Sequence, residues 1–287
     1  MITPSNPNGA LTPGSGGAVP SLLGIWRVGD RIASGKSAQL HLAQPADSVG
    51  NPRWDYLIKF APLDSQGPAR HEANRRIAAS YEAGKETSHA QLVSTRDGSP
   101  TGPTPFVVMS RLQGETLQDM LLRQVAIPLP QVLWIARQIT GATAALHQAG
   151  WIHGEIHPGA IFMDRGGQAC LLDLGSATRF HSQIRVAYRG DEAFASHERR
   201  STDIAALPGM DAFALGQLLW TLLTYNDTQD ETVLGPIADL VGELLDPDPQ
   251  VRPDAKSSER RLLDMELSAL SHHIGPAAVA TQRRSAA

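Results

Sequence analysis

The stretch that decides the fold reads His153-Gly154-Glu155-Ile156-His157-Pro158-Gly159-Ala160, and after a short hairpin it is followed by Leu171-Leu172-Asp173-Leu174-Gly175. His153, Glu155 and His157 alternate in the first part, so their side chains could lie on one face as three metal ligands. A transition-metal site is therefore one interpretation of this stretch. Asp173 stands where an apolar run meets a turn, a place where an acid can also be an ordinary turn former. The residues around these stretches decide between the interpretations.

The same two stretches are similar to the catalytic loop and the metal-binding turn of protein kinases, H-R-D-L-x-x-x-N and D-F-G. Three later segments resemble family motifs as well. Ser196-His197-Glu198 resembles A-P-E, the segment from Met210 to Gly216 resembles D-x-x-S-L-G, and the segment from Asp246 to Pro253 matches D-P-x-x-R-P. The resemblance covers about residues 22 to 270, and it implies an α+β, two-lobed protein kinase-like fold of the bacterial serine/threonine type.

Three residues in these later segments support the fold more than the chemistry. In the family, the residues at the places of Glu198 and Arg252 form a buried ion pair, and Asp211 belongs to the start of a buried helix. Losing one partner of a buried ion pair typically costs about 3–5 kcal/mol. We therefore expect Glu198, Asp211 and Arg252 to be structural residues.

The central loop departs from the family at four positions. The aspartate that accepts the substrate's hydroxyl proton is Glu155, and its extra methylene displaces the carboxylate; a displacement of about 1 Å can cost on the order of a hundredfold in rate. The asparagine that binds a second magnesium is Ala160, which has no ligand atom. His157 replaces a lysine that contacts the γ-phosphate, and it is only partly cationic near neutrality. Gly154 replaces the arginine that pairs with a phosphorylated activation loop, so that form of switching is not expected.

The residues that correspond to the family's nucleotide-binding positions match the family better than those of the central loop. The segment from Ile32 to Leu40 corresponds to the glycine-rich loop over the ATP phosphates, although of the three glycines it keeps only Gly35. Lys59 corresponds to the lysine that binds the α- and β-phosphates. An unpaired buried ammonium is costly, so a glutamate on the following helix is expected as its partner, with Glu72 preferred and Glu82 as the alternative.

The remaining nucleotide contacts follow from the same resemblance. Met109 corresponds to the gatekeeper, and Ser110 to Leu112 correspond to the hinge whose backbone meets adenine. Asp173 is kept, so ATP with magnesium at one site is implied. A Walker A loop is a rival interpretation, because Gly35-Lys36-Ser37 resembles its end, but that motif needs a glycine at the position of Asp30 and a helix where a strand is expected.

Composition gives an ordinary globular protein with 25 basic and 29 acidic residues, which does not suggest a nucleic-acid partner. Short basic pairs indicate solvated helix faces; they are Arg75-Arg76, Arg199-Arg200 and Arg260-Arg261. The single cysteine, Cys170, excludes an internal disulfide, fits a reducing cytoplasm and is expected in a buried strand. No apolar run has the length of a membrane span. Residues 1–21 are expected to be a disordered leader and residues 271–287 a flexible tail.

Periodicity predicts a five-stranded sheet with one helix up to about residue 110, and a mainly helical lobe from about 111 to 270. Expected strands are Ile25–Val28, Gln39–Leu42, Tyr56–Phe60, Gln91–Val93 and Phe106–Met109, with a hairpin of Ala160–Met163 and Ala169–Leu172 joined by Asp164-Arg165-Gly166-Gly167. Expected helices are Ala69–Ala83, Leu117–Gln124, Val132–Gln148, Asp211–Leu223, Ile237–Leu245 and Ala255–Leu270. Between Thr224 and Asp246 there is room for one helix, so the additional helix on which protein kinases often dock protein substrates is expected to be missing.

Three functional hypotheses follow. The preferred one is a pseudokinase that regulates or assembles an unidentified protein partner and can bind ATP. The second is a slow, active serine/threonine kinase in which Glu155 is the base, with Lys59 and His157 in the catalytic site and one magnesium on Asp173. The third is a small-molecule phosphotransferase, because residues 153–160 also resemble the H-G-D-x-H-P-G-N form found in aminoglycoside kinases.

Overall fold

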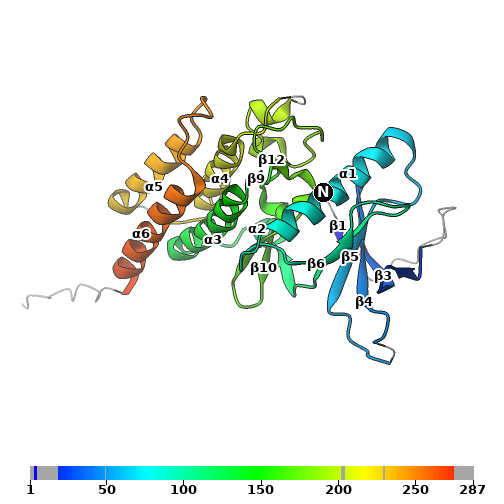
Figure 1. The fold of residues 1–287 in the computed structure, drawn as a ribbon. Helices are drawn as coiled ribbons and strands as arrows, with labels where there is room; N and C mark the ends of the chain where they lie inside the picture. Colours follow the sequence, from blue (N-terminus) through cyan, green and yellow to red (C-terminus); the bar gives the residue numbers. More distant parts are fainter. Residues whose placement is uncertain (1–2, 5–18, 49, 202–203, 229, 275–287) are drawn as a thin grey trace, which may run out of the picture.

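The structure is a computed structural model, and it describes residues 3–4, 19–48, 50–201, 204–228 and 230–274. A β-sheet with one long helix forms the N-terminal lobe, and a group of helices forms the C-terminal lobe (Figure 1). The chain therefore has the two-lobed α+β architecture predicted from its sequence. The expected leader and tail lie largely outside the described residues.

The N-terminal sheet is antiparallel, with strands in the order β1-β3-β4-β5-β7-β6 and with β2 paired to β3. Its strands are β1 (Thr3–Pro4), β2 (Leu22–Leu23), β3 (Trp26–Ser34), β4 (Gln39–Pro45), β5 (Tyr56–Phe60), β6 (Thr95–Ser99) and β7 (Phe106–Ser110). Ile58 and Phe60 are fully buried in a cluster with Trp26 and Phe106. Because side chains alternate along a strand, Lys59 points to the opposite face, toward the C-terminal lobe.

The strand predicted at Gln91 to Val93 is wrong. Leu92 forms an isolated bridge with Leu171, and the backbone N–H of Val93 donates to the Leu171 carbonyl oxygen over 2.9 Å. Both apolar side chains pack into the large core of the C-terminal lobe instead of the N-terminal sheet. A short apolar run marks burial here without marking a strand, and the outer strand of the sheet is the more polar β6.

Helix α1 (Gly67–Glu86) lies against the sheet and against the turn Leu174–Ser176 that follows β11. Its buried face includes Ala73, Ile77 and Ala83, as expected for a helix on a sheet, but it also includes Arg76. The prediction that Arg75-Arg76 is a solvated pair is therefore wrong for Arg76, which is 6% exposed. A buried arginine needs partners, and these lie in the candidate site.

The C-terminal lobe has its core on α3, which packs against α4 and α6 (Figure 1). Its helices are α2 (Leu117–Leu122), α3 (Leu129–Gln148), α4 (Pro208–Leu223), α5 (Glu231–Leu244) and α6 (Ala255–Ile274). Its strands are β8 (Gly114–Thr116), β9 (Trp151–Ile152), β10 (Ile161–Asp164), β11 (Ala169–Leu171) and β12 (Thr178–Arg179), and β10 and β11 form the predicted hairpin. Short 3-10 turns lie at Pro158–Ala160, Leu174–Ser176, Glu192–Phe194 and Glu198–Arg200.

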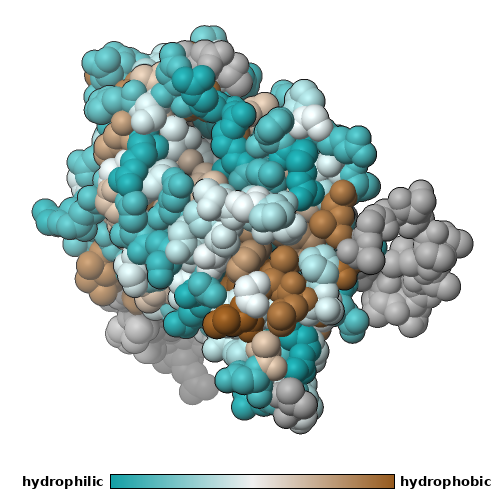
Figure 2. Space-filling model, turned by 45° about the vertical axis from the view of Figure 1, so that its right-hand side comes forward, coloured by the Kyte–Doolittle hydropathy of each residue, from teal (hydrophilic) through white to brown (hydrophobic). Residues whose placement is uncertain are grey.

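Helix α5 is the one helix that the described residues hold between Thr224 and Asp246, which agrees with the missing helix inferred from the short spacing. It begins earlier than predicted, at Glu231, and Asp230 caps it by accepting a hydrogen bond from the backbone N–H of Thr232. Every described helix is too short or too polar to span a bilayer. Figure 2 shows a largely hydrophilic face with one gathering of apolar side chains near its lower middle.

Candidate functional site

The backbone of the central loop is fastened to α4 through Asp211. Its carboxylate accepts hydrogen bonds from the backbone N–H groups of His153 over 2.7 Å and Gly154 over 2.8 Å, and it lies 3.0 Å from His147 Nε2. Asp211 is fully buried; burial opposes its ionisation, but the neighbouring His147 and the backbone donors hold its pKa below the ordinary value. This contact positions the loop.

His153 is buried, and both of its ring nitrogens bind backbone groups. Nε2 lies 2.8 Å from the Leu172 carbonyl oxygen, and Nδ1 lies 3.2 Å from the backbone nitrogen of Glu155. The carbonyl oxygen accepts at Nε2 and the backbone N–H of Glu155 faces Nδ1, so both ring nitrogens are engaged by the backbone. Neither nitrogen is left for a metal, and among the described residues no group of three His, Cys, Asp or Glu side chains could hold one.

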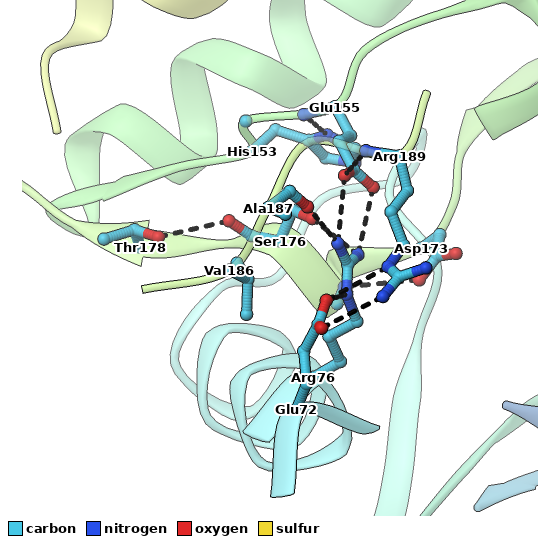
Figure 3. Close-up of polar contacts among 12 residues, drawn as sticks. Glu72, Arg76, His153, Glu155, Asp173, Ser176, Thr178, Val186, Ala187 and Arg189 are labelled. Atoms are coloured by element: carbon cyan, nitrogen blue, oxygen red, sulfur yellow. Dashed lines mark hydrogen bonds and ion pairs between the residues drawn. The ribbon is translucent and has the colours of Figure 1, made fainter. Parts of the chain in front are cut away.

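Both carboxylate oxygens of Glu155 are occupied by donors from the N-terminal lobe and from the segment after β12 (Figure 3). Arg76 Nη1 lies 3.2 Å from Oε2, Arg76 Nη2 lies 3.2 Å from Oε1, and the backbone nitrogen of Arg189 lies 2.8 Å from Oε1. Burial alone would raise the pKa of Glu155, but the charge and hydrogen bonds of Arg76 outweigh it, so the pKa is lowered. Glu155 is thus held as an anion.

Arg76 is a residue of this site that the sequence interpretation missed, and Arg189 is another. Its guanidinium also donates to Ser176 Oγ over 2.8 Å and to the Ala187 carbonyl oxygen over 2.5 Å, and its Nε lies 3.5 Å from Glu72. One side chain therefore joins α1, the central loop and the segment that follows the Asp173 turn. The spacing of Glu72 and Arg76, one helical turn apart, was the available signal.

Lys59 pairs with Asp173, so the predicted Lys59–Glu72 pair is corrected. Glu72 instead accepts two hydrogen bonds from Arg189, each over 3.0 Å, while Glu82 is exposed. The physical reason is competition: Arg189 and Arg76 both reach Glu72 and satisfy it, which leaves Asp173 as the acid facing Lys59. Burial opposes ionisation of Asp173, but the Lys59 ammonium holds the pKa of this carboxyl far below its usual range.

Helix α1 holds the segment of residues 185–189 over the central loop. Arg75 donates to the Arg185 carbonyl oxygen over 2.6 Å, next to the bonds from Arg76 to Ala187 and from Arg189 to Glu72. Figure 3 shows this segment beside Glu155, with the Arg76 side chain reaching between them. The segment thus lies against Glu155, and the backbone N–H of Arg189 donates to its carboxylate.

Gly154 stands at the position where the family has an arginine. In this chain the side chain of Arg199, from a later segment, lies next to Gly154. Its Nε donates to the Gly154 carbonyl oxygen over 2.8 Å, and a methyl group added at Gly154 would lie 3.3 Å from that Nε. Gly154 has φ of +78°, a conformation that favours glycine. The prediction of a solvated Arg199-Arg200 pair is wrong for Arg199, which is 2% exposed.

The remaining predicted site residues have these positions. His157 caps the turn Pro158–Ala160 by accepting from the Gly159 N–H over 3.1 Å, and burial lowers its pKa, so it is neutral at pH 7. Ala160 is buried. Met109 and Ser110 end β7, and Leu112 follows them before β8. The roles of Met109, Ser110 and Leu112 toward adenine stay predictions.

A cavity of about 300 Å³ lies between the loop that joins β3 to β4 and the central loop. Lys36 and Ala38 line it on one side, and Lys59, Glu155 and Asp173 line it on the other. The turn is tight, because the Gly35 N–H donates to the Ala38 carbonyl oxygen over 2.8 Å. A strand, β4, follows it, so the Walker A interpretation is wrong.

The structural pair is formed by Glu198 and Arg252. Arg252 Nη1 lies 2.5 Å from Glu198 Oε1, and the same nitrogen donates to the Gly209 carbonyl oxygen over 2.7 Å. The pair links the end of the segment after the Asp173 turn to α4 and to the loop before α6.

Comparison with known proteins agrees with this fold and geometry. Residues 55–233 match the family model of the protein kinase domain, so the chain belongs to that family. It is 27% identical over 175 residues to the serine/threonine-protein kinase PknL of Mycobacterium tuberculosis (strain CDC 1551 / Oshkosh), covering 60% of this chain and 44% of that protein. It is 25% identical over 211 residues to PknB of Mycobacterium leprae, covering 71% and 33%, and 27% identical over 157 residues to PrkC of Bacillus subtilis, covering 54% and 24%.

The chain thus spans less than half the length of these serine/threonine-protein kinases. Protein kinases as a family use ATP and Mg²⁺. Whether this chain binds ATP and Mg²⁺ depends on residues such as Lys59, Glu155 and Asp173.

Proposed function

We propose that this chain is a pseudokinase: a protein kinase-like domain that does not transfer phosphate and acts on a protein partner through its surface. The observation that carries the proposal is the occupation of Glu155 by Arg76 and by the backbone N–H of Arg189. A general base must lie within hydrogen-bond reach of the proton that it abstracts. Glu155 has donors on both oxygens and a lowered pKa, which makes it a poor acceptor for a substrate hydroxyl.

The loss of metal ligands supports the same proposal. Ala160 offers no oxygen where the family's second magnesium ligand stands, and one Asp173 oxygen is engaged by Lys59 and lies 3.3 Å from the Gly175 backbone nitrogen. Phosphoryl transfer in this family depends on metal ions that neutralise the developing charge. The chain thus keeps Lys59 and Asp173, which correspond to the family's nucleotide-binding residues, but it has changed residues at Glu155 and Ala160, where the family has the catalytic base and a second magnesium ligand.

A protein partner is part of the proposal. The gathering of apolar side chains in Figure 2 lies on an otherwise hydrophilic face, and such patches often mark interaction sites. The absence of a further helix between Thr224 and Asp246 in the described part of the chain removes a common docking surface for protein substrates. A cytoplasmic location remains the expectation from the single cysteine.

The second candidate is a slow serine/threonine kinase. Lys59 and Asp173 face the cavity as a pair, as an ATP site with one magnesium on Asp173 would need. This activity requires the Arg76–Glu155 contact to break so that Glu155 can serve as base. A small-molecule phosphotransferase is less favoured, because Arg76 and the backbone N–H of Arg189 engage the Glu155 carboxylate that a small acceptor would need as its base.

Labelled ATP separates these functions. The protein is incubated with ATP and Mg²⁺, alone and with generic protein substrates, beside the variants Lys59→Met and Asp173→Asn. We expect the same background signal from all three proteins. Phosphate incorporation that depends on Lys59 would replace the pseudokinase proposal with the slow kinase.

A further inference from the structure

The cavity below the β3–β4 loop carries an excess of positive charge. Four cationic side chains line it, and two carboxylates do, Glu155 and Asp173. Glu155 is already neutralised by Arg76, and Asp173 by Lys59. Arg189 is paired with Glu72, so Lys36 is the lining cation that has no acidic partner among the described residues.

Lys36 and Arg189 are the cations available at the mouth of the cavity. Lys36 is exposed in the tight turn between β3 and β4 and lines the same cavity as Lys59. Arg189 is paired with Glu72 but keeps 36% of its side chain exposed. Lysine and arginine donate charge-assisted hydrogen bonds to phosphate oxygens, so both suit a polyphosphate.

A magnesium ion fits the same cavity poorly. The carboxylate oxygens of Glu155 are engaged by Arg76 and Arg189, Asp173 Oδ1 is engaged by Lys59, and Ala160 supplies no ligand. Magnesium needs oxygen ligands in octahedral geometry, and here the surrounding cations oppose it.

We propose that the cavity binds the phosphate chain of a nucleoside triphosphate without a divalent cation. Lys36 supplies positive charge that has no acidic partner, and Lys59 and Arg189 supply further N–H donors to the phosphate oxygens beside their contacts with Asp173 and Glu72. The proposal deepens the nucleotide binding in the proposed function and rests on it. Lys36 is the residue that tests this arrangement, because it is exposed on the β3–β4 loop, lines the cavity, and has no acidic partner among the described residues.

Calorimetric titration of the full chain with ATP tests the proposal, once in EDTA and once with Mg²⁺. We expect the two dissociation constants to agree within about threefold, since a charge already supplied by side chains gains little from the metal. Lys36→Ala should weaken binding in EDTA by about tenfold, as loss of a hydrogen bond to a charged group does. Lys85→Ala is the matched control: it removes the same charge from an exposed position on α1 outside the cavity and should bind as the unaltered protein does.

Asp173→Asn gives the sharpest contrast, because it removes the remaining metal ligand and a charge that repels phosphate. Without metal involvement its affinity for ATP in EDTA stays the same or rises, and a ligand-free melting curve shows whether the variant is folded. Binding that appears with Mg²⁺ and vanishes in EDTA would overturn the proposal, as would no heat at millimolar ATP in either buffer. Neither outcome contradicts the pseudokinase proposal, because that proposal is contradicted by phosphate transfer that depends on Lys59.

Discussion

Arg76, on α1 of the N-terminal lobe, places both Nη atoms 3.2 Å from the two carboxylate oxygens of Glu155 in the central loop of the C-terminal lobe. Both side chains are buried, at 6% and 8% exposure. Such a pair is costly to separate, because each charge without the other lies in a medium of low dielectric constant. The contact links the lobes through the position at which the family has its catalytic base.

Arg76→Met should lower the free energy of unfolding by about 3–5 kcal/mol, because it leaves the Glu155 carboxylate buried without its main partner. Urea denaturation measures the change. Arg75→Met is the neighbouring control, since Arg75 is exposed and makes one hydrogen bond to the Arg185 carbonyl oxygen; its cost should be about 1 kcal/mol.

The double variant Arg76→Met with Glu155→Gln should recover part of that loss, since it removes both buried charges. If Arg76→Met alone is no more harmful than Arg75→Met, the two residues are not a buried pair in solution.

Gly154→Arg, which restores the family's residue, should destabilise the protein by about 1–3 kcal/mol. Gly154 has φ of +78°, and an added Cβ would lie 3.0 Å from the Ser176 carbonyl oxygen and 3.3 Å from Arg199 Nε. Thermal melting compares this variant with Gly166→Arg in the exposed hairpin, where the nearest atom to an added Cβ is at 3.3 Å on a single side chain and φ is not positive. Equal melting temperatures would show that Arg199 does not fill the space beside Gly154.

Acid should destabilise the protein partly through Asp173. Its folded-state pKa lies below the ordinary 3.8, so the unfolded chain binds more protons and the free energy of unfolding falls as the pH drops through about 4. The contribution is fully present above about pH 5. In Asp173→Asn the slope of unfolding free energy against pH between pH 3 and 5 should be shallower, whereas Asp239→Asn, at an exposed site on α5, should keep it. An unchanged slope in Asp173→Asn would mean that Lys59 does not depress this pKa.

Loss of the Glu198–Arg252 pair should also cost about 3–5 kcal/mol, because the Arg252 side chain is 2% exposed and its guanidinium would lose its anion. Glu198→Gln tests this in urea, with Glu192→Gln as an exposed control in the same segment. A Glu198→Gln variant as stable as the control would show that this pair does not hold the lobe together.

Local sequence patterns predict those elements well whose structure is decided by residues close together in the chain. Tyr56–Phe60 is a strand with the predicted bounds, and the glycine pair at 166–167 forms the predicted hairpin turn. Helix ends were predicted less well: Pro68 and Pro208 start α1 and α4 from their first turns, earlier than the apolar periodicity alone indicates.

The site was predicted less completely, since its contacts join residues far apart in the chain. From the sequence alone, Arg76 and Arg199 are predicted to be surface charges. In the structure both are buried beside Glu155, because the loop of residues 153–160 packs against them. The partner of Lys59 also depends on the tertiary structure, because Arg189 competes for Glu72 from a segment more than a hundred residues away.

The role of Glu155 is the central claim, and transfer of labelled phosphate by Glu155→Gln compared with the unaltered protein tests it most directly, with Lys59→Met as background. The account predicts that all three proteins give the same signal, since Glu155 is a structural anion held by Arg76. Transfer by the unaltered protein that exceeds the Lys59→Met background and disappears in Glu155→Gln would contradict it, because Glu155 would then be acting as the catalytic base.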